Sequence, residues 1–294
     1  MKEPFEIQTT LITDIGRARS RNQDNLGIHE PEDPALLSDS GRLYIVADGA
    51  GGVGGAIAGK IASRYSVCKV KDVYFRAAGS AAPIGDRLRS AMLAANDAIR
   101  EHVERPRRTR QMATTMVAMV IRGGELTVAN VGDSRAYLMR DNTIRQITQD
   151  HSLVAGLLAD GIITPDEAIN HPQRNVILYS LGSAPHEPRI DIFELKLRPD
   201  DLILACTDGL TRYTNEEKLL ALLNDGPREE AAQRLIDFAN ESGGADNVTV
   251  AVLRITKRAL PRWVWWLLLF AGISLIALSG FAGLAMAGWN LLGG

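Results

Sequence analysis

The chain is poor in cysteine, and it carries no excess of positive charge. Only two of its 294 residues are cysteines, Cys68 and Cys206, and their spacing fits neither a disulfide framework nor a zinc site. The formal net charge is -2 at pH 7, so nothing points to a nucleic acid as partner. The N-terminus lacks the apolar run of a cleaved secretion signal, and we expect none.

Charged residues are missing altogether from Trp263 to Gly294. A helix over residues 263–289 would be about 40 Å long, compared with a hydrocarbon core of roughly 30 Å. The four tryptophans of the chain lie at the two ends of this segment, as in an aromatic belt. We therefore predict a transmembrane helix over 263–289, preceded by a basic juxtamembrane segment at 258–262 and followed by a short external tail at 290–294.

Basic residues before the predicted span set its orientation. Arg254, Lys257, Arg258 and Arg262 precede it, and no charged residue follows it. The positive-inside rule then predicts a single-pass protein of the cell (inner) membrane, with residues 1–262 in the cytoplasm and the lipid bilayer as a partner.

Residues 1–257 read as a single α+β domain, because strand-like runs dominate and no linker or repeat interrupts them. Strands are predicted at 7–12, 43–47, 114–121, 126–131, 135–139, 190–195, 201–206 and 248–255. Helices are predicted at 56–66, 84–103, 218–223 and 228–241, with capping boxes at 164–167 and 214–217. A polar stretch at about 151–183 interrupts this pattern and is interpreted as a flap over the site.

Four aspartates lie where apolar runs end or turns begin. Asp48 and Asp208 each follow a strand-like run and precede a glycine, while Asp133 and Asp246 lie in acidic turns. Carboxylates held rigidly at a sheet edge are ligands for hard cations, so this pattern predicts a site for Mg²⁺ or Mn²⁺.

The glycines after Asp48 allow two interpretations. Residues 49–54 match G-x-G-x-x-G between a strand and a helix, which superficially fits a dinucleotide-binding turn. The remaining strands read as antiparallel hairpins rather than βαβ units, so this interpretation is the weaker one. In the preferred interpretation the glycines let the backbone bend, so that the Asp48 carboxylate and the Gly49 carbonyl face the same ion.

Several short motifs occur in a fixed order along residues 8–256. They are Arg19-Ser20-Arg21-Asn22-Gln23-Asp24, Val46-Ala47-Asp48-Gly49-Ala50-Gly51-Gly52, Ala113-Thr114-Thr115, Gly132-Asp133-Ser134-Arg135, Thr207-Asp208-Gly209-Leu210 and Asp246-Asn247-Val248-Thr249. This series resembles that of the metal-dependent serine/threonine protein phosphatases of type 2C, bacterial branch. The resemblance implies a four-layer α-β-β-α sandwich of two antiparallel sheets flanked by helices, with the site at one end of the sheets.

The resemblance also implies a role for each motif residue, with Mn²⁺ or Mg²⁺ as cofactor. Asp48, Asp208, Asp246 and Arg19 are the implied catalytic residues. Asp48 would bridge two ions, of which one also binds the Gly49 carbonyl and the other is held by Asp208 and Asp246. Asp133 with Asp208 would hold a third ion, and Asp24 would bind through a metal-bound water. Arg19 would bind the substrate phosphate, and Asn247 would orient Asp246. The implied reaction is hydrolysis of phosphoserine and phosphothreonine in proteins. A serine/threonine kinase of the same membrane and its targets are the expected partners.

Two departures from the family pattern leave an alternative open. Gln23 stands where an acid is usual, and Val53 stands where many bacterial relatives have histidine. They support a second hypothesis, a catalytically weak phosphoprotein-binding regulatory module of the same fold. The acid that protonates the leaving group is unassigned, with His151 and a metal-bound water as candidates. The basic cluster at 105–110 is interpreted as a solvated loop or, alternatively, as a docking patch.

Overall fold

The computed structural model describes residues 5–51, 55–104, 112–169, 171–183 and 187–257. The chain divides into two compact units, Met1–Thr256 and Lys257–Gly294, and the fold described here is that of the first. Val53, the basic cluster at 105–110 and the predicted membrane segment lie outside the described residues. Among the helices that the structure describes, none is both long and apolar enough to cross a bilayer.

Two five-stranded sheets and one small two-stranded sheet make up the β structure. The strand order of the first sheet is β1 (Phe5–Asp14), β12 (Val248–Lys257), β11 (Leu202–Cys206), β8 (Arg135–Arg140) and β9 (Thr143–Gln146). The order of the second sheet is β10 (Asp191–Lys196), β7 (Glu125–Val131), β6 (Met116–Arg122), β3 (Arg42–Ala47) and β2 (Asn25–His29). The small sheet pairs β4 (Gly49–Ala50) with β5 (Ala113–Thr114).

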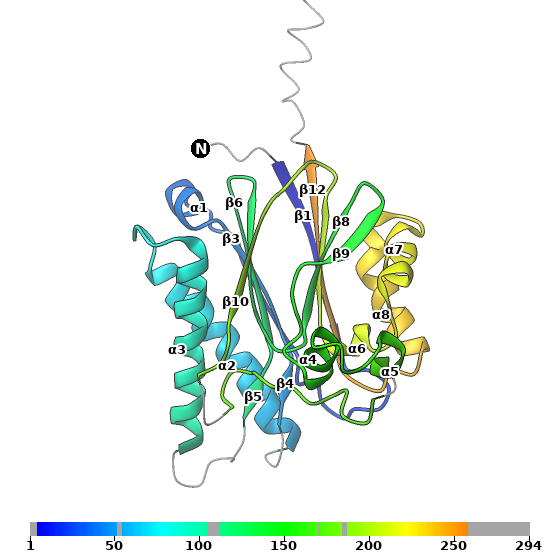
Figure 1. Cartoon of the computed structure of the whole chain (residues 1–294). Helices are drawn as coiled ribbons and strands as arrows, with labels where there is room; N and C mark the ends of the chain where they lie inside the picture. The colour runs from blue at the N-terminus through cyan, green and yellow to red at the C-terminus, as the bar shows by residue number, and fades with distance from the viewer. Residues whose placement is uncertain (1–4, 52–54, 105–111, 170, 184–186, 258–294) are drawn as a thin grey trace, which may run out of the picture. The chain divides into compact units, whose positions relative to one another are not determined.

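Helices cover the outer faces of both sheets (Figure 1). The helices of the described residues are α1 (Pro34–Ser40), α2 (Gly55–Arg76), α3 (Ile84–Glu104), α4 (Leu153–Ala159), α5 (Pro165–Ile169), α6 (Asp208–Thr211), α7 (Glu216–Asn224) and α8 (Ala231–Glu241), with a 3₁₀ turn, η2 (Arg228–Glu230). The short helices α4, α5 and α6 lie at one end of the sandwich. The long pair α2 and α3 packs on the second sheet, and α7 and α8 pack on the first. This arrangement confirms the predicted α+β fold of two antiparallel sheets flanked by helices.

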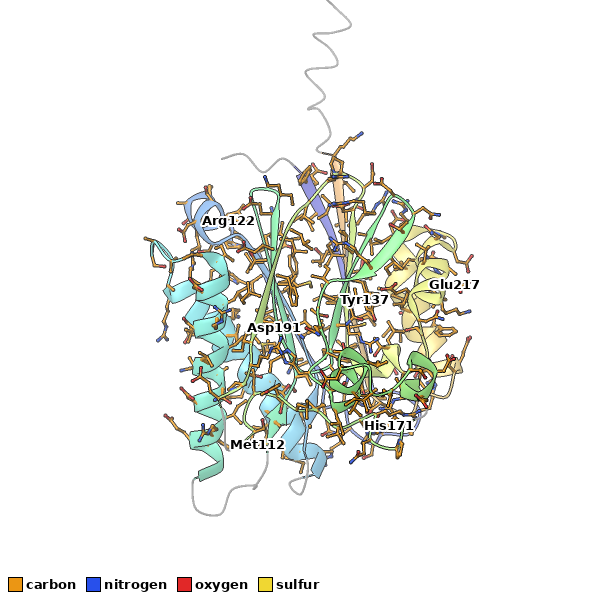
Figure 2. All side chains as sticks on the ribbon, viewed as in Figure 1. Met112, Arg122, Tyr137, His171, Asp191 and Glu217 are labelled. Carbon is orange, nitrogen blue, oxygen red and sulfur yellow. The ribbon has the colours of Figure 1, made fainter. Side chains whose placement is uncertain are left out.

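Three apolar clusters fill the layers, and strand alternation assigns each side chain to one of them. In β3, Leu43 and Ile45 pack beneath the helices, whereas Tyr44 and Val46 face the opposite sheet. Figure 2 shows side chains filling the space between the two sheets. Burial on both faces explains why these strands read as unbroken apolar runs.

The dinucleotide-binding alternative is wrong, because the strand that precedes the glycines belongs to no parallel unit. β3 lies between β2 and β6 and pairs antiparallel with both. A Rossmann turn needs a parallel βαβ crossover at this point.

One predicted capping box is confirmed and the other is corrected. Thr164 and Glu167 exchange hydrogen bonds at the start of α5, as predicted. At α7 the N-cap is Asn215, whose Oδ1 accepts from the Lys218 N–H at 2.8 Å. Thr214 instead donates its hydroxyl to the carbonyl of Leu210, so the prediction placed this cap one residue too early.

Strand direction brings the acidic motifs to one end of the sandwich. β11 and β12 are antiparallel neighbours, so Asp208, after β11, and Asp246, just before β12, lie at the same sheet edge. Asp133 follows β7 and Asp48 follows β3 in the other sheet. The predicted flap contains α4 and α5. Hydrogen bonds of Leu153 to Val176 and of Leu178 to His151 join its two ends, and that of Leu181 to Thr114 attaches it to β5.

Candidate active site

The main chain of Asp48 is fixed by the two threonines of the Ala113-Thr114-Thr115 motif. The Asp48 carbonyl accepts hydrogen bonds from the Thr114 hydroxyl at 2.7 Å and the Thr115 N–H at 2.9 Å. The Thr115 hydroxyl also lies 2.7 Å from that of Ser134, beside Asp133. The threonine motif therefore joins two acidic segments through buried hydroxyl groups.

Gly49 is required by close packing rather than by a special backbone angle. A Cβ on Gly49 would collide with the carbonyl of Gly59 in α2, and a Cβ on Gly59 would lie 2.5 Å from the Gly49 oxygen. The first turns of α2 thus pack directly against the β4 backbone. Gly49 and Ala50 form a short strand that pairs with β5, while residues 52–54 of the glycine run lie outside the described residues.

Asp24 is buried, and two threonines that sequence reasoning missed orient its carboxylate. Thr207 and Thr249 donate hydroxyl hydrogens to Asp24 Oδ2 at 2.9 and 2.7 Å. Asp24 Oδ1 is buried and has no hydrogen-bond partner among the described residues. One oxygen of Asp24 is thus held by the fold, and the other is left for a ligand.

Asn247 positions the loop that carries Arg19. Its side-chain amide donates to the carbonyls of Ile15 at 2.8 Å and Arg21 at 3.0 Å, and its oxygen accepts from the Gln23 N–H at 2.8 Å. The orienting contact to Asp246 comes from the Asn247 backbone N–H, which donates to Asp246 Oδ1 at 2.9 Å. The side chain of Asn247 therefore shapes the N-terminal loop rather than the carboxylate of Asp246.

Two arginines lie on the acidic cluster. Arg19 donates to Asp246 Oδ2 at 2.7 Å. Arg212 donates to Asp208 Oδ2 at 2.9 Å and approaches Asp246 Oδ2 at 3.5 Å. Within the part of the chain that the structure describes, no group of three or more histidine, cysteine or acidic side chains is arranged to hold an ion. These two arginines place positive charge directly on Asp208 and Asp246.

Burial and mutual repulsion make several of these carboxylates hard to ionise. Burial raises the pKa of Asp24 to about 7, with a contribution from repulsion by Asp208. Burial raises the pKa of Asp133 to about 7 in the same way. The pKa of Asp48 lies well above its usual value because of burial and then repulsion from Asp24, Asp208 and Asp133. Such a cluster needs nearby cations to be fully charged at neutral pH.

The donor chemistry of these residues suits divalent cations, although no three of the described side chains form a ready ion-binding cluster. Asp133 Oδ1 and Asp208 Oδ1, like Asp24 Oδ1, are buried without a hydrogen-bond donor among the described residues. Unpartnered buried carboxylate oxygens are costly unless a cation or proton occupies them. Hard oxygen donors of this kind suit Mg²⁺ and Mn²⁺, which agrees with the predicted cofactor.

His151 has a structural position at the base of the flap. Its Nδ1 accepts from the Gly132 N–H at 3.3 Å, so Nε2 carries the proton that points to Asp191 Oδ2 at 3.2 Å. Its ring also stacks edge-on against Tyr179 of the flap. With both nitrogens engaged inside the protein, His151 positions the turn before Asp133 rather than facing a leaving group.

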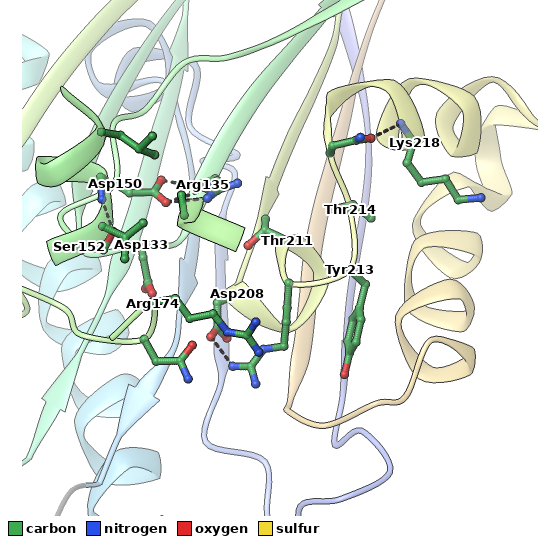
Figure 3. A pocket seen from close by; sticks show the side chains of 17 residues that line it. Asp133, Arg135, Asp150, Ser152, Arg174, Asp208, Thr211, Tyr213, Thr214 and Lys218 are labelled. Atoms are coloured by element: carbon green, nitrogen blue, oxygen red, sulfur yellow. Dashed lines mark hydrogen bonds and ion pairs between the residues drawn. The ribbon is translucent and has the colours of Figure 1, made fainter. Parts of the chain in front are cut away.

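A cavity of about 610 Å³ opens beside Asp133 and Asp208. Its walls come from the flap on one side and from the segment around Arg212 and α7 on the other (Figure 3). Arg174 extends from the flap toward Asp208. The volume is in the usual range of ligand pockets, so the acidic cluster borders a space that a substrate segment can enter.

Comparisons with known proteins decide the family. The chain matches the family described as Protein phosphatase 2C over residues 16–242. The chain belongs to the protein phosphatase 2C family. It is 36% identical over 244 residues to the serine/threonine phosphatase stp of Listeria welshimeri, with 82% of this chain and 93% of that protein covered.

Solved structures of the family agree. Serine/threonine phosphatase Stp1 of Staphylococcus aureus superposes with a TM-score of 0.76 at 30% identity, covering 86% of this chain and 97% of that one. The catalytic domain of the phosphatase PstP, solved with two manganese ions, gives a TM-score of 0.71 at 32% identity, covering 85% of this chain and 99% of that one. Family membership confirms the prediction of a metal-dependent phosphoprotein phosphatase with manganese or magnesium as cofactor.

Proposed function

We propose that the chain is a membrane-anchored protein serine/threonine phosphatase whose catalytic domain faces the cytoplasm. Its substrates are phosphoserine and phosphothreonine side chains of proteins, among them a kinase of the same membrane and the targets of that kinase. The observation that carries the catalytic part is the set of buried, unpartnered carboxylate oxygens of Asp24, Asp133 and Asp208 at one end of the two sheets.

Different residues of the site would bind the ions and the phosphate in the proposed hydrolysis. Two divalent cations, when bound, lower the pKa of a water and neutralise charge that develops on the phosphoryl group. Asp48, Asp208, Asp246 and the Gly49 carbonyl would hold these ions, with Asp133 beside a third. Arg19 offers a planar fork of donors next to Asp246 and binds the phosphate, which fixes the phosphorus in line for attack.

The membrane part of the proposal is supported by the sequence. The uncharged stretch at 263–289, its terminal tryptophans and the basic residues before it favour a single membrane span with residues 1–262 on the cytoplasmic side. An anchor of this kind raises the effective concentration of the enzyme near substrates in the same membrane.

Phosphate release from a phosphothreonine peptide tests the catalytic part. We expect the full chain, purified in detergent, to turn over the peptide with Mn²⁺ and to stop when a chelator is added. Asp208→Asn should lower kcat by at least about a hundredfold, because an essential ligand is lost. Asp48→Asn and Asp246→Asn should be equally damaging. Peptide binding without turnover by the unmodified chain would favour the regulatory module instead.

A further inference from the structure

Arg212 touches the acidic cluster although no recognised motif contains it. It lies four residues after Asp208, and its side chain is 22% exposed. One nitrogen, Nη2, lies 2.9 Å from Asp208 Oδ2 and 3.5 Å from Asp246 Oδ2. The dashed line at Asp208 in Figure 3 marks the shorter of these ion pairs. One guanidinium thus bridges two carboxylates that the proposed function assigns to an ion.

The two carboxylates differ in what remains available to an ion. Asp208 keeps Oδ1 buried and without a donor among the described residues. Asp246 has no comparable oxygen, because Oδ1 accepts from the Asn247 N–H while Oδ2 accepts from Arg19 and lies close to Arg212. A divalent ion can therefore reach Asp246 Oδ2 only in exchange for guanidinium contacts.

Electrostatic repulsion also favours displacement of the Arg212 guanidinium when a divalent ion binds. A guanidinium beside a ligand carboxylate repels an incoming dication, and at a partly buried site this repulsion is screened less than in water. The cavity of about 610 Å³ is lined by Arg212 and gives the side chain room to move away.

We propose that Arg212 is an exchangeable cation of the metal site, which pairs with Asp208 and Asp246 until divalent ions replace it and thereby lowers the affinity of the site for manganese. The proposal rests on the proposed function, since it assumes that these carboxylates are metal ligands. It adds that Arg212 sets the manganese concentration at which the site becomes occupied.

Calorimetric titration of the metal-free full chain in detergent with MnCl₂ tests the proposal. We expect Arg212→Gln and Arg212→Leu, which both remove the charge, to bind Mn²⁺ about three- to tenfold more tightly than the unmodified chain. Arg212→Lys keeps the charge and should stay within about twofold. The matched control is Arg76→Gln. It breaks the ion pair of Arg76 with Asp72 on α2, which has the same four-residue spacing, and should leave the affinity for Mn²⁺ unchanged.

Thermal unfolding gives a second readout that does not depend on catalysis. Without metal, the charge-removing variants should melt at a lower temperature than the unmodified chain, because Asp208 loses the Arg212 charge and Asp246 keeps only that of Arg19. With saturating Mn²⁺ the difference should vanish, so the rise in Tm on adding metal is larger in these variants.

The outcomes separate this proposal from the proposed function. Unchanged or weaker Mn²⁺ binding by Arg212→Gln, in a protein whose unmodified form binds the ion, overturns the role of Arg212 and leaves the phosphatase intact. Weaker binding in particular would show that Arg212 orients the carboxylates for the ion. An unmodified chain that binds no Mn²⁺ would overturn both.

Discussion

At the scale of single residues, the site is defined by which carboxylate oxygens the fold holds and which it leaves open. Thr207 and Thr249 hold one oxygen of Asp24, and the other is unpartnered among the described residues. The fold therefore orients the carboxylate without neutralising it, which is how outer hydrogen bonds prepare a metal ligand.

The raised pKa values predict that the metal-free protein loses stability as the pH rises. Asp24 and Asp133 have folded-state pKa values of about 7, compared with 3.8 for the ordinary side chain. The folded state then binds more protons than the unfolded state between about pH 4 and pH 7, so unfolding becomes easier across this window. We expect a lower Tm in chelator at pH 7.5 than at pH 5.

Manganese supplies the control for this pH effect. Carboxylates must lose their protons to bind an ion, so added Mn²⁺ should remove or reverse the decline. Asp133→Asn, which abolishes one of these titrations, should make the metal-free decline shallower. A Tm that rises with pH in chelator would show that the fold does not raise the pKa of these carboxylates.

Asp133 should be separable from the two-ion core. We expect Asp133→Asn to lower kcat by about tenfold or more while calorimetry still detects two strongly bound Mn²⁺ ions, because Asp48, Asp208 and Asp246 are intact. Asp166→Asn, an exposed acid at the start of α5 in the flap, is the control and should alter neither quantity. Loss of both strong binding events in Asp133→Asn would assign Asp133 to the core pair.

The motif aspartates could be predicted from the sequence, whereas their supporting partners could not. Asp48 and Asp208 each end an apolar run, which is a local signal. The donors to Asp24 lie 183 and 225 positions away along the chain, and only strand pairing brings them together. Arg212 gives no local signal either, since an arginine four residues after an aspartate is usually a plain helix-surface pair.

At the scale of elements, α2 packs against the backbone of β4 because the two residues at the contact are glycines. Gly49 in β4 and Gly59 in α2 approach so closely that a methyl group on either would collide with backbone atoms of the other. The helix thereby fixes the carbonyl that the proposed function gives to an ion.

Gly59→Ala tests this contact. The new Cβ would collide with the Gln23 side chain and lie 2.5 Å from the Gly49 oxygen, so we expect a loss of about 2 kcal/mol or more in the free energy of unfolding. Mn²⁺ binding should also weaken, because the Gly49 carbonyl has to shift. Denaturant unfolding and calorimetry measure the two effects.

Gly156→Ala is the matched control for Gly59→Ala. Gly156 lies in α4, and a Cβ there meets nothing within 4 Å. The change should leave stability unaltered or raise it by up to about 1 kcal/mol through helix propensity. Equal effects of the two substitutions would show that the Gly49–Gly59 contact has no special importance.

Element prediction succeeded where the apolar stripe was clear and failed where the elements were short or the stripe was weak, as in α2, which was predicted only at 56–66 but continues to Arg76. The apolar stripe of residues 84–103 predicted α3 almost residue for residue. β2 was missed, because its five residues include Gly27, which the pattern reads as a break. Gly27 is needed there, since a Cβ would lie 2.7 Å from the Val67 side chain on α2.

At the scale of the whole molecule, the described cores and sheets of the first unit end before the C-terminal segment begins. The three apolar clusters of this unit draw on residues up to Ile255, and β12 pairs with β11 as far as Arg254. The unit Met1–Thr256 therefore contains both sheets, all of the helices described above and every candidate site residue.

A chain that ends after Lys257 should then fold, leave the membrane fraction and keep its activity. We expect its kcat/KM on a soluble phosphothreonine peptide to stay within about twofold of the full chain, because no described site residue is lost. A cut after Val250 is the destabilising control, since it removes Leu253 and Ile255 from the core between the sheets.

Sedimentation of lysates that express each form locates the proteins. A full chain that stays in the supernatant would contradict the anchor, and an inactive but folded chain ending at Lys257 would show that residues 258–294 contribute to the site itself.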